Sequence, residues 1–399
     1  MSNIKMQEQN SKDNSIGTIF KNKERVLKTE FDNDVITEGE FTEIDDTSKE
    51  KIDTNKIISE ISARIVGQEE AIVTLVTNIY YNQVLIDELS SDYFIDLAQL
   101  DSRKVGILLD GSTGTGKTAI LKDIASRLDL PIYICNANSF SETGYVGPSI
   151  TDILRKLYFI AGRSVNKAER GIVVLDEIDK LSSRNSIDSK DMKKGVQEEL
   201  LGFISGGEYD FPLDENLHNS KMIHFDTSKL TFILSGAFTS IKERKRNELE
   251  KKKKRVGFSS SDSNINDESY IITAQDYIDE GMHREFFGRV KVLTSTRTYN
   301  YDDLKTILLT STISPLKNFE KTVQMFGYSG ITYTDDFIHE LCTQALEMGT
   351  GARALQTIMS GVQNSLLRGL INQSFDMDKK IDLTSDLLHD YNKSLVRRF

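Results

Sequence analysis

Short, continuously apolar segments alternate with helical patterns through the middle of the chain. Four of these segments predict strands, at residues 105–110, 132–135, 172–175 and 230–234. The segments between them, such as residues 118–128, place apolar residues at helical spacing. Strands that are buried on both faces are apolar throughout rather than alternating. The sequence therefore predicts an α/β fold in which helices flank a parallel sheet.

The segments on either side of this α/β region have different patterns. Residues 52–86 show a helical pattern, and from Tyr301 onward the chain is mainly amphipathic helix with a strand-like piece near residues 331–333. The N-terminal segment is polar and then strongly acidic, which predicts a disordered tail. We expect three parts: an acidic tail at 1–50, a large domain at 51–298 and a small, mainly helical domain at 299–399.

Two polar stretches interrupt the regular pattern. Residues 182–194 are irregular, and residues 241–269 begin with a dense charge run at 242–255 and continue into a serine-rich segment. Both are predicted to be long exposed loops, which in compact domains are commonly functional or disordered. For the charge run, a solvated helix is the alternative.

Composition limits the kinds of protein that fit this pattern. The 61 acidic and 50 basic residues give a net charge of −11, which argues against nucleic acid as the main partner because phosphate backbones select basic surfaces. No run of about 18 apolar residues is present, and residues 1–10 lack a signal-peptide core. Cys135 and Cys342 lie in apolar contexts and are predicted to be buried, reduced thiols rather than zinc ligands. These features predict a cytoplasmic protein with no membrane partner.

Residues 111–118 carry the clearest chemical signal. They read Gly-Ser-Thr-Gly-Thr-Gly-Lys-Thr, which fits the phosphate-binding pattern G-x-x-x-x-G-K-[ST] between a predicted strand and a predicted helix. A flexible glycine turn is the alternative, but it does not require that context. Lys117 would supply charge to the β- and γ-phosphates of ATP, and the Thr118 hydroxyl would ligate Mg²⁺. The predicted ATP-binding residues of this segment are Gly111, Ser112, Thr113, Gly114, Thr115, Gly116, Lys117, Thr118 and Ala119.

The predicted strand at 172–175 supplies the carboxylates that this site needs, because it ends in Asp176 and Glu177. Alone, an apolar strand that ends in two acids is common, but its pairing with the glycine loop favours a functional role. Asp176 is predicted to hold Mg²⁺, and Glu177 to orient and deprotonate the attacking water. A catalytic Glu favours ATP hydrolysis over transfer to a metabolite, since a kinase must exclude water.

Further motifs follow one another in order. They are residues 64–68 (Arg-Ile-Val-Gly-Gln), 144–147 (Gly-Tyr-Val-Gly), 171–180, 226–229, 235–238 (Ser-Gly-Ala-Phe), 284–289 (Arg-Glu-Phe-Phe-Gly-Arg) and 349–353 (Gly-Thr-Gly-Ala-Arg). With them, residues 55–375 closely resemble the ClpX family of AAA+ protein unfoldases. The resemblance implies an AAA+ P-loop domain, a smaller C-terminal domain and a homo-hexameric ring.

The resemblance also implies roles for single residues. Ile65 and Val66 would contact adenine, and Ser235 is a candidate for sensor 1. Arg289 would reach the γ-phosphate of the neighbouring subunit, although a surface arginine paired with a carboxylate is the alternative. Arg353, at sensor 2, would touch the phosphates from the small domain, so that nucleotide state sets the angle between the domains.

Two motifs would act on proteins rather than on ATP. Gly144, Tyr145, Val146 and Gly147 match the family's first pore loop, where an apolar side chain grips unfolded or tagged polypeptides without reading their sequence. A tight turn with a packed Tyr145 is the alternative. Residues 182–194 would form the second pore loop.

Val256, Gly257 and Phe258 resemble the tripeptide with which the family docks on the ClpP peptidase. An incidental loop is the alternative, since three residues alone carry little information. Their place between the Ser-Gly-Ala-Phe and Arg-Glu-Phe-Phe-Gly-Arg motifs adds weight to the docking interpretation.

The chain also departs from the family pattern. Its two cysteines cannot build the family's N-terminal zinc-binding module, whose place the acidic tail takes, and residues 213–221 do not show the basic Arg-Lys-His loop. The leading hypothesis is nevertheless an ATP-driven unfoldase that feeds a ClpP-type peptidase. A remodelling chaperone that works without a peptidase is the second hypothesis. A nucleic-acid motor or a nucleotide-gated scaffold is the third.

Overall fold

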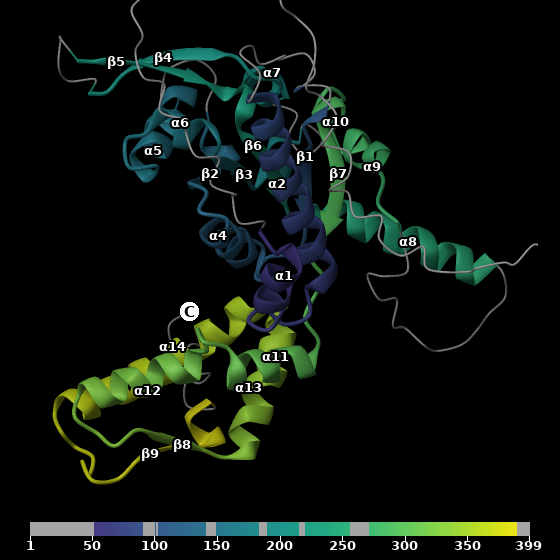
Figure 1. Ribbon diagram of the computed structural model, residues 1–399. Coiled ribbons are helices and arrows are strands. Elements are labelled where there is room, and N and C mark those ends of the chain that lie inside the picture. The colour runs from purple at the N-terminus through teal and green to yellow at the C-terminus, as the bar shows by residue number, and fades with distance from the viewer. Residues whose placement is uncertain are drawn as a thin grey trace, which may run out of the picture. The chain divides into compact units, whose positions relative to one another are not determined.

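Five parallel strands form the central sheet of the computed structural model (Figure 1). The structure describes residues 52–90, 100, 103–140, 149–182, 190–214, 220–255 and 271–388. In spatial order the strands are β2 (Ile132–Asn136), β3 (Ile172–Asp176), β6 (Thr231–Gly236), β1 (Gly106–Asp110) and β7 (Val290–Ser295). All neighbouring pairs run parallel, which confirms the predicted α/β class.

Helices bury both faces of this sheet. Alternate residues of a strand point to opposite faces, so Ile107 and Leu109 of β1 join one apolar core while Leu108 joins the other. The helices whose apolar residues join the first core are α1 (Thr54–Ser62), α2 (Glu69–Ser90) and α4 (Lys117–Arg127). The helices of the second core include α5 (Ile150–Ile160), α6 (Val165–Glu169) and α7 (Lys190–Ser205). Burial on both faces explains why the strands predicted at 105–110, 172–175 and 230–234 are apolar throughout, whereas β2, at the edge of the sheet opposite β7, is only partly buried.

The fifth strand, β7, was not predicted from the sequence. It lies at the edge of the described sheet and pairs with β1. Its residues alternate between more buried and more exposed positions, from buried Val290 to exposed Ser295, so no continuous apolar run marks it. The antiparallel hairpin of β4 (Glu208–Pro212) and β5 (Met222–Asp226) was missed for the same reason.

The prediction of an exposed loop over residues 241–269 was wrong for residues 241–255. They belong to helix α8 (Thr239–Arg255), which agrees with the alternative interpretation of the charge run as a helix. Lys, Arg and Glu have good helix propensity, and the buried Ile241 anchors the first turn. Ion pairs from Arg244 to Glu280 and from Lys245 to Asp276 tie α8 to the region of α9 (Ala274–Asp279). Helix α7 likewise begins inside the predicted loop at 182–194.

The C-terminal region is mainly helical, as predicted. Its elements are α11 (Tyr301–Thr310), α12 (Pro315–Met325), β8 (Ile331–Tyr333), α13 (Asp335–Met348), α14 (Ala352–Ile371) and β9 (Ile381–Leu383). They enclose an apolar core of their own, which includes Phe319, Phe337 and Leu355. Asn300 and Asp303 form a reciprocal capping box at the start of α11, which fixes where that helix begins.

Both cysteines lie in apolar cores. Burial raises the pKa of Cys135 to about 12 and that of Cys342 to about 11, which keeps both thiols protonated at neutral pH. Over the described residues, no helix has the length and apolar character needed to cross a bilayer.

Candidate nucleotide-binding site

Residues 111–118, called the phosphate loop below, connect β1 to α4. Gly114 and Gly116 adopt positive φ angles of 79° and 93°, which other residues rarely tolerate. A side chain on Gly114 would also collide with the C-terminal region, because its Cβ would lie 2.0 Å from the carbonyl oxygen of Thr350. The loop can therefore form only with glycine at these positions.

Lys117 brings a partly buried cation to this loop. Its Nζ donates hydrogen bonds to the carbonyl oxygen of Gly111 and, at 3.1 Å, to that of Ser112. Burial lowers the pKa of Lys117, and the nearby Asp176 carboxylate acts in the opposite direction. The ammonium and the amides of the first turn of α4 together make a site that suits an anion.

Asp176 and Glu177 stand where β3 ends. The backbone N–H of Glu177 donates to Asp176 Oδ1 at 2.9 Å, and Glu177 itself has a positive φ of 57°. Its Oε2 accepts a hydrogen bond of 2.8 Å from Nδ2 of Asn136, the last residue of the neighbouring strand β2. Left-handed backbone at a residue other than glycine stores strain and is common at functional sites. The side-chain amide of Asn136, which no sequence motif had indicated, therefore holds the Glu177 carboxylate.

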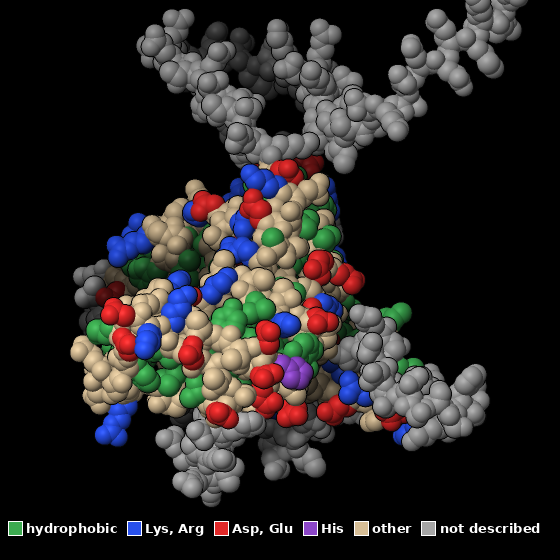
Figure 2. Space-filling model, turned by 90° about the horizontal axis from the view of Figure 1, so that it is seen from below, with side chains coloured by type: hydrophobic (Ala, Val, Ile, Leu, Met, Phe, Trp, Pro, Cys, Tyr) green, Lys and Arg blue, Asp and Glu red, His purple; other side chains and the backbone are tan. Residues whose placement is uncertain are grey.

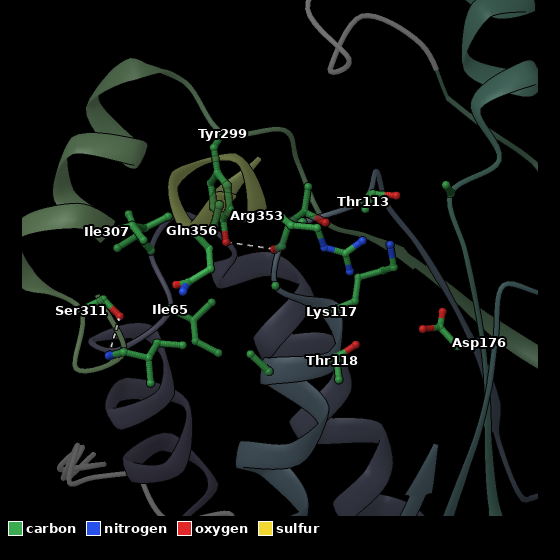
Figure 3. Close-up of a pocket in the computed structure, with 18 of the residues that line it drawn as sticks. Ile65, Thr113, Lys117, Thr118, Asp176, Tyr299, Ile307, Ser311, Arg353 and Gln356 are labelled. Carbon is green, nitrogen blue, oxygen red and sulfur yellow. Dashed lines mark hydrogen bonds between the residues drawn. The ribbon is translucent and has the colours of Figure 1, made fainter. Parts of the chain in front are cut away.

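A cavity of about 480 Å³ joins these groups. Figure 3 shows Lys117, Arg353 and Asp176 on one side of it and Ile65, Ile307 and Ser311 on the other. The cavity therefore has a charged side and a more apolar side, as a nucleotide with phosphates and a flat base requires. The predicted residues that line it are Ile65, Val66, Thr113, Gly114, Thr115, Gly116, Lys117, Thr118, Ala119, Asp176, Glu177 and Arg353.

The C-terminal region supplies a wall of this cavity and contacts the phosphate loop directly. The backbone N–H of Ala352 donates to the carbonyl oxygen of Gly114 at 3.0 Å. The Tyr299 hydroxyl donates to the carbonyl oxygen of Thr115 at 3.0 Å. Arg353 and Gln356 lie three residues apart on α14, so both can face the cavity from one side of the helix.

Residues 64–68, which are predicted to contact adenine, are connected to the C-terminal region by side-chain hydrogen bonds. The Gln68 side chain exchanges two hydrogen bonds of 2.9 Å with the backbone of Arg297. Arg297 in turn forms a bidentate ion pair with Asp303, at 2.5 and 2.9 Å. The segment around Arg297 therefore connects residues 64–68, the end of β7 and the start of α11.

Some predicted site residues lie elsewhere. Ser235 is buried within β6 and does not line the cavity, although the next two residues, Gly236 and Ala237, do. Arg289 ends α10 (Phe286–Arg289), directly before β7, and does not line it either. Gly111 and Ser112 contribute backbone oxygens to Lys117. The pore-loop residues 144–147 and the docking residues 256–258 lie outside the described residues.

Several residues of the site were not predicted. Asn136, Tyr299 and Gln356 act on the loop or the cavity through contacts between segments that are distant in sequence. The apolar side of the cavity also includes Ile307, Ile313 and Pro315. Positive φ at Glu177 is a signal that only the structure could give.

The donor set fits a divalent cation. The Thr118 hydroxyl and the Asp176 carboxylate line one cavity with Glu177 and Asp179, and hard oxygen ligands of this kind suit Mg²⁺. The phosphates of a nucleotide commonly complete such a coordination shell.

Comparison with known proteins agrees with this arrangement. The family described as AAA domain (Cdc48 subfamily) matches residues 102–293. Over 307 residues the chain is 30% identical to the ATP-dependent Clp protease ATP-binding subunit ClpX of Treponema denticola, covering 74% of this chain and 72% of that protein. It is 31% identical over 313 residues to the protein of the same name from Porphyromonas gingivalis, covering 76% and 74% of the two chains. It is 30% identical over 321 residues to that of Bacteroides thetaiotaomicron, covering 78% and 75%. An ATPase site on a five-stranded parallel sheet, together with this similarity, shows that the chain belongs to the ClpX family of AAA+ ATPases.

Proposed function

We propose that this ATPase unfolds proteins and moves them through a ring of six copies into a ClpP-type peptidase. The observation that carries the proposal is that the phosphate loop and the C-terminal region build one cavity between them. A nucleotide in this cavity would touch both parts, so binding and hydrolysis would change how the C-terminal region packs on the loop.

Within the cavity each predicted residue has a distinct task. Lys117 would bind the β- and γ-phosphates, and Thr118 and Asp176 would hold Mg²⁺, which supplies charge neutralisation for the phosphates when bound. Glu177, held by Asn136, would accept a proton from the attacking water. Arg353 would sense the phosphates from α14, and Ile65 and Val66 would pack on the base. Ser235 stays a candidate that could act on the site only through its neighbours in β6.

A role for Arg289 at the γ-phosphate requires a second copy of the chain. Arg289 is only partly buried and does not line its own chain's cavity. An arginine supplied by a neighbouring subunit would make hydrolysis depend on assembly, because the cation balances charge that develops in the transition state. This argument supports the homo-hexamer as part of the proposal.

The mechanical output is assigned to segments that lie outside the described residues. Tyr145, between Gly144 and Val146-Gly147, would grip the polypeptide, and Val256, Gly257 and Phe258 would dock on the peptidase. The names of the relatives, which contain the words Clp protease, support the docking proposal. The docking tripeptide directly follows α8, so a helix would lead from the ATPase core to it.

Charge does not favour a nucleic-acid motor. The chain carries a net charge of −11, and on the face shown in Figure 2 acidic side chains are interspersed with basic ones rather than excluded by them. Nucleic acid is bound mainly through clustered Lys and Arg.

The decisive experiment measures degradation of a stably folded, tagged protein by the chain together with ClpP and ATP. Tyr145→Ala is expected to leave ATP hydrolysis within about twofold of the unaltered chain and to abolish degradation, because a methyl group grips poorly. Tyr333→Ala is the matched control, since Tyr333 is an exposed tyrosine on β8. This variant should support degradation of the tagged substrate at the unaltered rate.

Two results would count against the proposal. Undiminished degradation by the Tyr145→Ala variant would remove the pore-loop assignment. If deletion of residues 256–258 leaves protein remodelling intact and sedimentation detects no complex with ClpP, the chain is a remodelling chaperone that works without a peptidase.

A further inference from the structure

A buried carboxylate stands directly before the phosphate loop. Asp110 is the last residue of β1 and is 1% exposed. Its carbonyl oxygen accepts a hydrogen bond of 2.8 Å from Thr296 N, and the next amide, Gly111 N, donates to Gly236 O at 3.0 Å. The Asp110 side chain does not line the nucleotide cavity. Nothing in the proposed chemistry therefore explains why a charged residue occupies this place.

Two side chains from distant elements converge on this carboxylate. Lys242 Nζ, in the first turns of α8, lies 2.9 Å from Asp110 Oδ1, and its side chain is 13% exposed. The Tyr277 hydroxyl, on α9, donates to Asp110 Oδ2 at 3.2 Å. The Tyr277 ring is itself held edge-on to Phe238, with ring centroids 4.7 Å apart, and stacked on Phe287. The end of β1 is thus pinned to α8 and α9 by an ion pair and a hydrogen bond.

Burial of such a pair contributes little net stability. Both ions lose their hydration, and apolar residues of similar size commonly stabilise a fold equally well. Burial raises the pKa of Asp110, while the Lys242 ammonium and the Tyr277 hydroxyl oppose that rise. What the pair adds over apolar packing is a specific placement, because the Lys242 ammonium lies against Asp110 Oδ1 and the Tyr277 hydroxyl adds a directional hydrogen bond to Oδ2.

The end of β1 leads directly to the backbone that holds Lys117. Lys117 Nζ donates to the carbonyl oxygen of Gly111, the residue after Asp110. On the other side of the loop, Thr115 Oγ1 lies 2.6 Å from Thr296 Oγ1, and Thr296 N donates to Asp110. A shift at the end of β1 would therefore move both the carbonyl that holds Lys117 and Thr296, which contacts the loop directly after β7.

We propose that Asp110, Lys242 and Tyr277 are positioning residues for ATP hydrolysis, which lock the start of the phosphate loop to α8 and α9. They act through the loop and do not touch the nucleotide. The inference depends on the ATPase activity and is independent of protein unfolding or of a peptidase partner.

The test is the double variant Asp110→Leu/Lys242→Met, assayed in the full-length chain by steady-state ATP hydrolysis and thermal unfolding. The variant removes both charges and leaves no buried ion unpaired, so the fold is expected to persist. We expect kcat to fall about tenfold, because a misplacement of about 1 Å at a catalytic group can cost up to about 100-fold. KM for ATP should stay within about threefold, since the residues that line the cavity are unchanged.

Lys245→Met is the matched control. Lys245 lies one turn further along α8 and pairs with Asp276 Oδ1 at 2.7 Å, so its loss breaks an ion pair between the same helix and α9 without touching Asp110. This variant should hydrolyse ATP with unchanged kcat and KM. If Lys242→Met and Lys245→Met slow hydrolysis equally, the effect belongs to the packing of α8 and the proposal fails.

Two further outcomes decide the matter. A folded double variant whose kcat stays within about twofold of the unaltered chain overturns the positioning role, even if its melting temperature falls. If the double variant does not fold, Tyr277→Phe takes its place, because this change removes only the hydroxyl and keeps the ring contacts. An unchanged kcat in Tyr277→Phe, with Lys242→Met also unchanged, equally overturns the proposal.

Discussion

Gly351 lies against the phosphate loop, which makes Gly351→Ala an informative change. The residue immediately precedes α14 and has φ 57° and ψ −142°, a conformation that is essentially restricted to glycine. An added Cβ would lie 2.7 Å from the carbonyl oxygen of Gly114 and 3.0 Å from its carbonyl carbon. Both are backbone atoms of the loop and cannot rotate away.

The cost follows from two contributions. Holding alanine in this backbone conformation costs about 1–3 kcal/mol. Separating the two segments would also break the hydrogen bond from Ala352 N to Gly114 O, which is worth about 0.5–1.5 kcal/mol. The total is about 2–4 kcal/mol. It would be relieved either by movement of the C-terminal region away from the loop or by distortion of the loop. Since about 1.4 kcal/mol corresponds to a factor of ten, we expect kcat/KM for ATP to fall at least about 30-fold.

Gly349→Ala is the control that isolates the collision. Gly349 ends α13 with φ 64° and ψ 13°, and an added Cβ would have no atom within 4 Å. It therefore imposes a backbone cost of about 1–2 kcal/mol without pushing on the loop. Both variants should lower the melting temperature in thermal unfolding, but only Gly351→Ala should impair ATP hydrolysis strongly. Equal ATPase activity in the two variants would refute the idea that contact between this segment and the loop sets activity.

Two other predictions test the supports of the site. Asn136→Ala should lower kcat about tenfold with little change in KM, because the Asn136 side chain orients Glu177. A hydrogen bond to a charged group is worth about 1.5–3 kcal/mol. An unchanged kcat would contradict this role of Asn136. Burial pushes the pKa of Asp303 up, but hydrogen bonds from Arg297 and Asn300 N outweigh it and hold that pKa below 3.8. A depressed folded pKa stabilises the fold above the ordinary value and loses this effect as pH falls through the folded value. Asp303→Asn should therefore reduce the free energy of unfolding in urea at pH 7. The difference from the unaltered chain should shrink below about pH 4. A difference that is independent of pH would argue against the ion pair.

The predictable part of the fold is the part with local signals. Strands β1, β3 and β6 are buried on both faces, so their apolar runs are visible in the sequence. Edge strand β2 is only partly buried, but its run is apolar enough to be recognised as well. Edge strand β7 is half exposed and carries Lys291 and Thr294, so it looks like a surface segment until its pairing with β1 is known. The charge run of α8 similarly suggests solvent, whereas Lys242 is directed at a buried carboxylate of another element.

The residues of the site likewise divide into those with a local sequence signal and those without one. The loop at 111–118 and the pair Asp176-Glu177 have fixed local spacing, and the structure brings them together in one cavity. Whether that placement gives each residue its predicted role stays a prediction, as it does for Ser235 and Arg289. Asn136 and Tyr299 have no local signal, because each acts through a partner that is far away in the sequence. Gln356 lines the cavity from α14, whose first residue contacts the phosphate loop.

Several contacts that the sequence could not reveal converge on residues 296–299, and this convergence has a consequence for coupling. Tyr299 donates to Thr115, Thr296 contacts Thr115, and the backbone of Arg297 is hydrogen-bonded to Gln68 of the motif predicted to contact adenine. The sequence separations of these contacts are 184, 181 and 229 residues. One short segment thus contacts the phosphate loop and the motif at the opposite end of the cavity, and then leads into α11. Since packed interfaces have discrete arrangements rather than continuous ones, a change at either end of the nucleotide should reach α11 through this segment. We therefore predict that the segment between β7 and α11 transmits nucleotide binding to the C-terminal region.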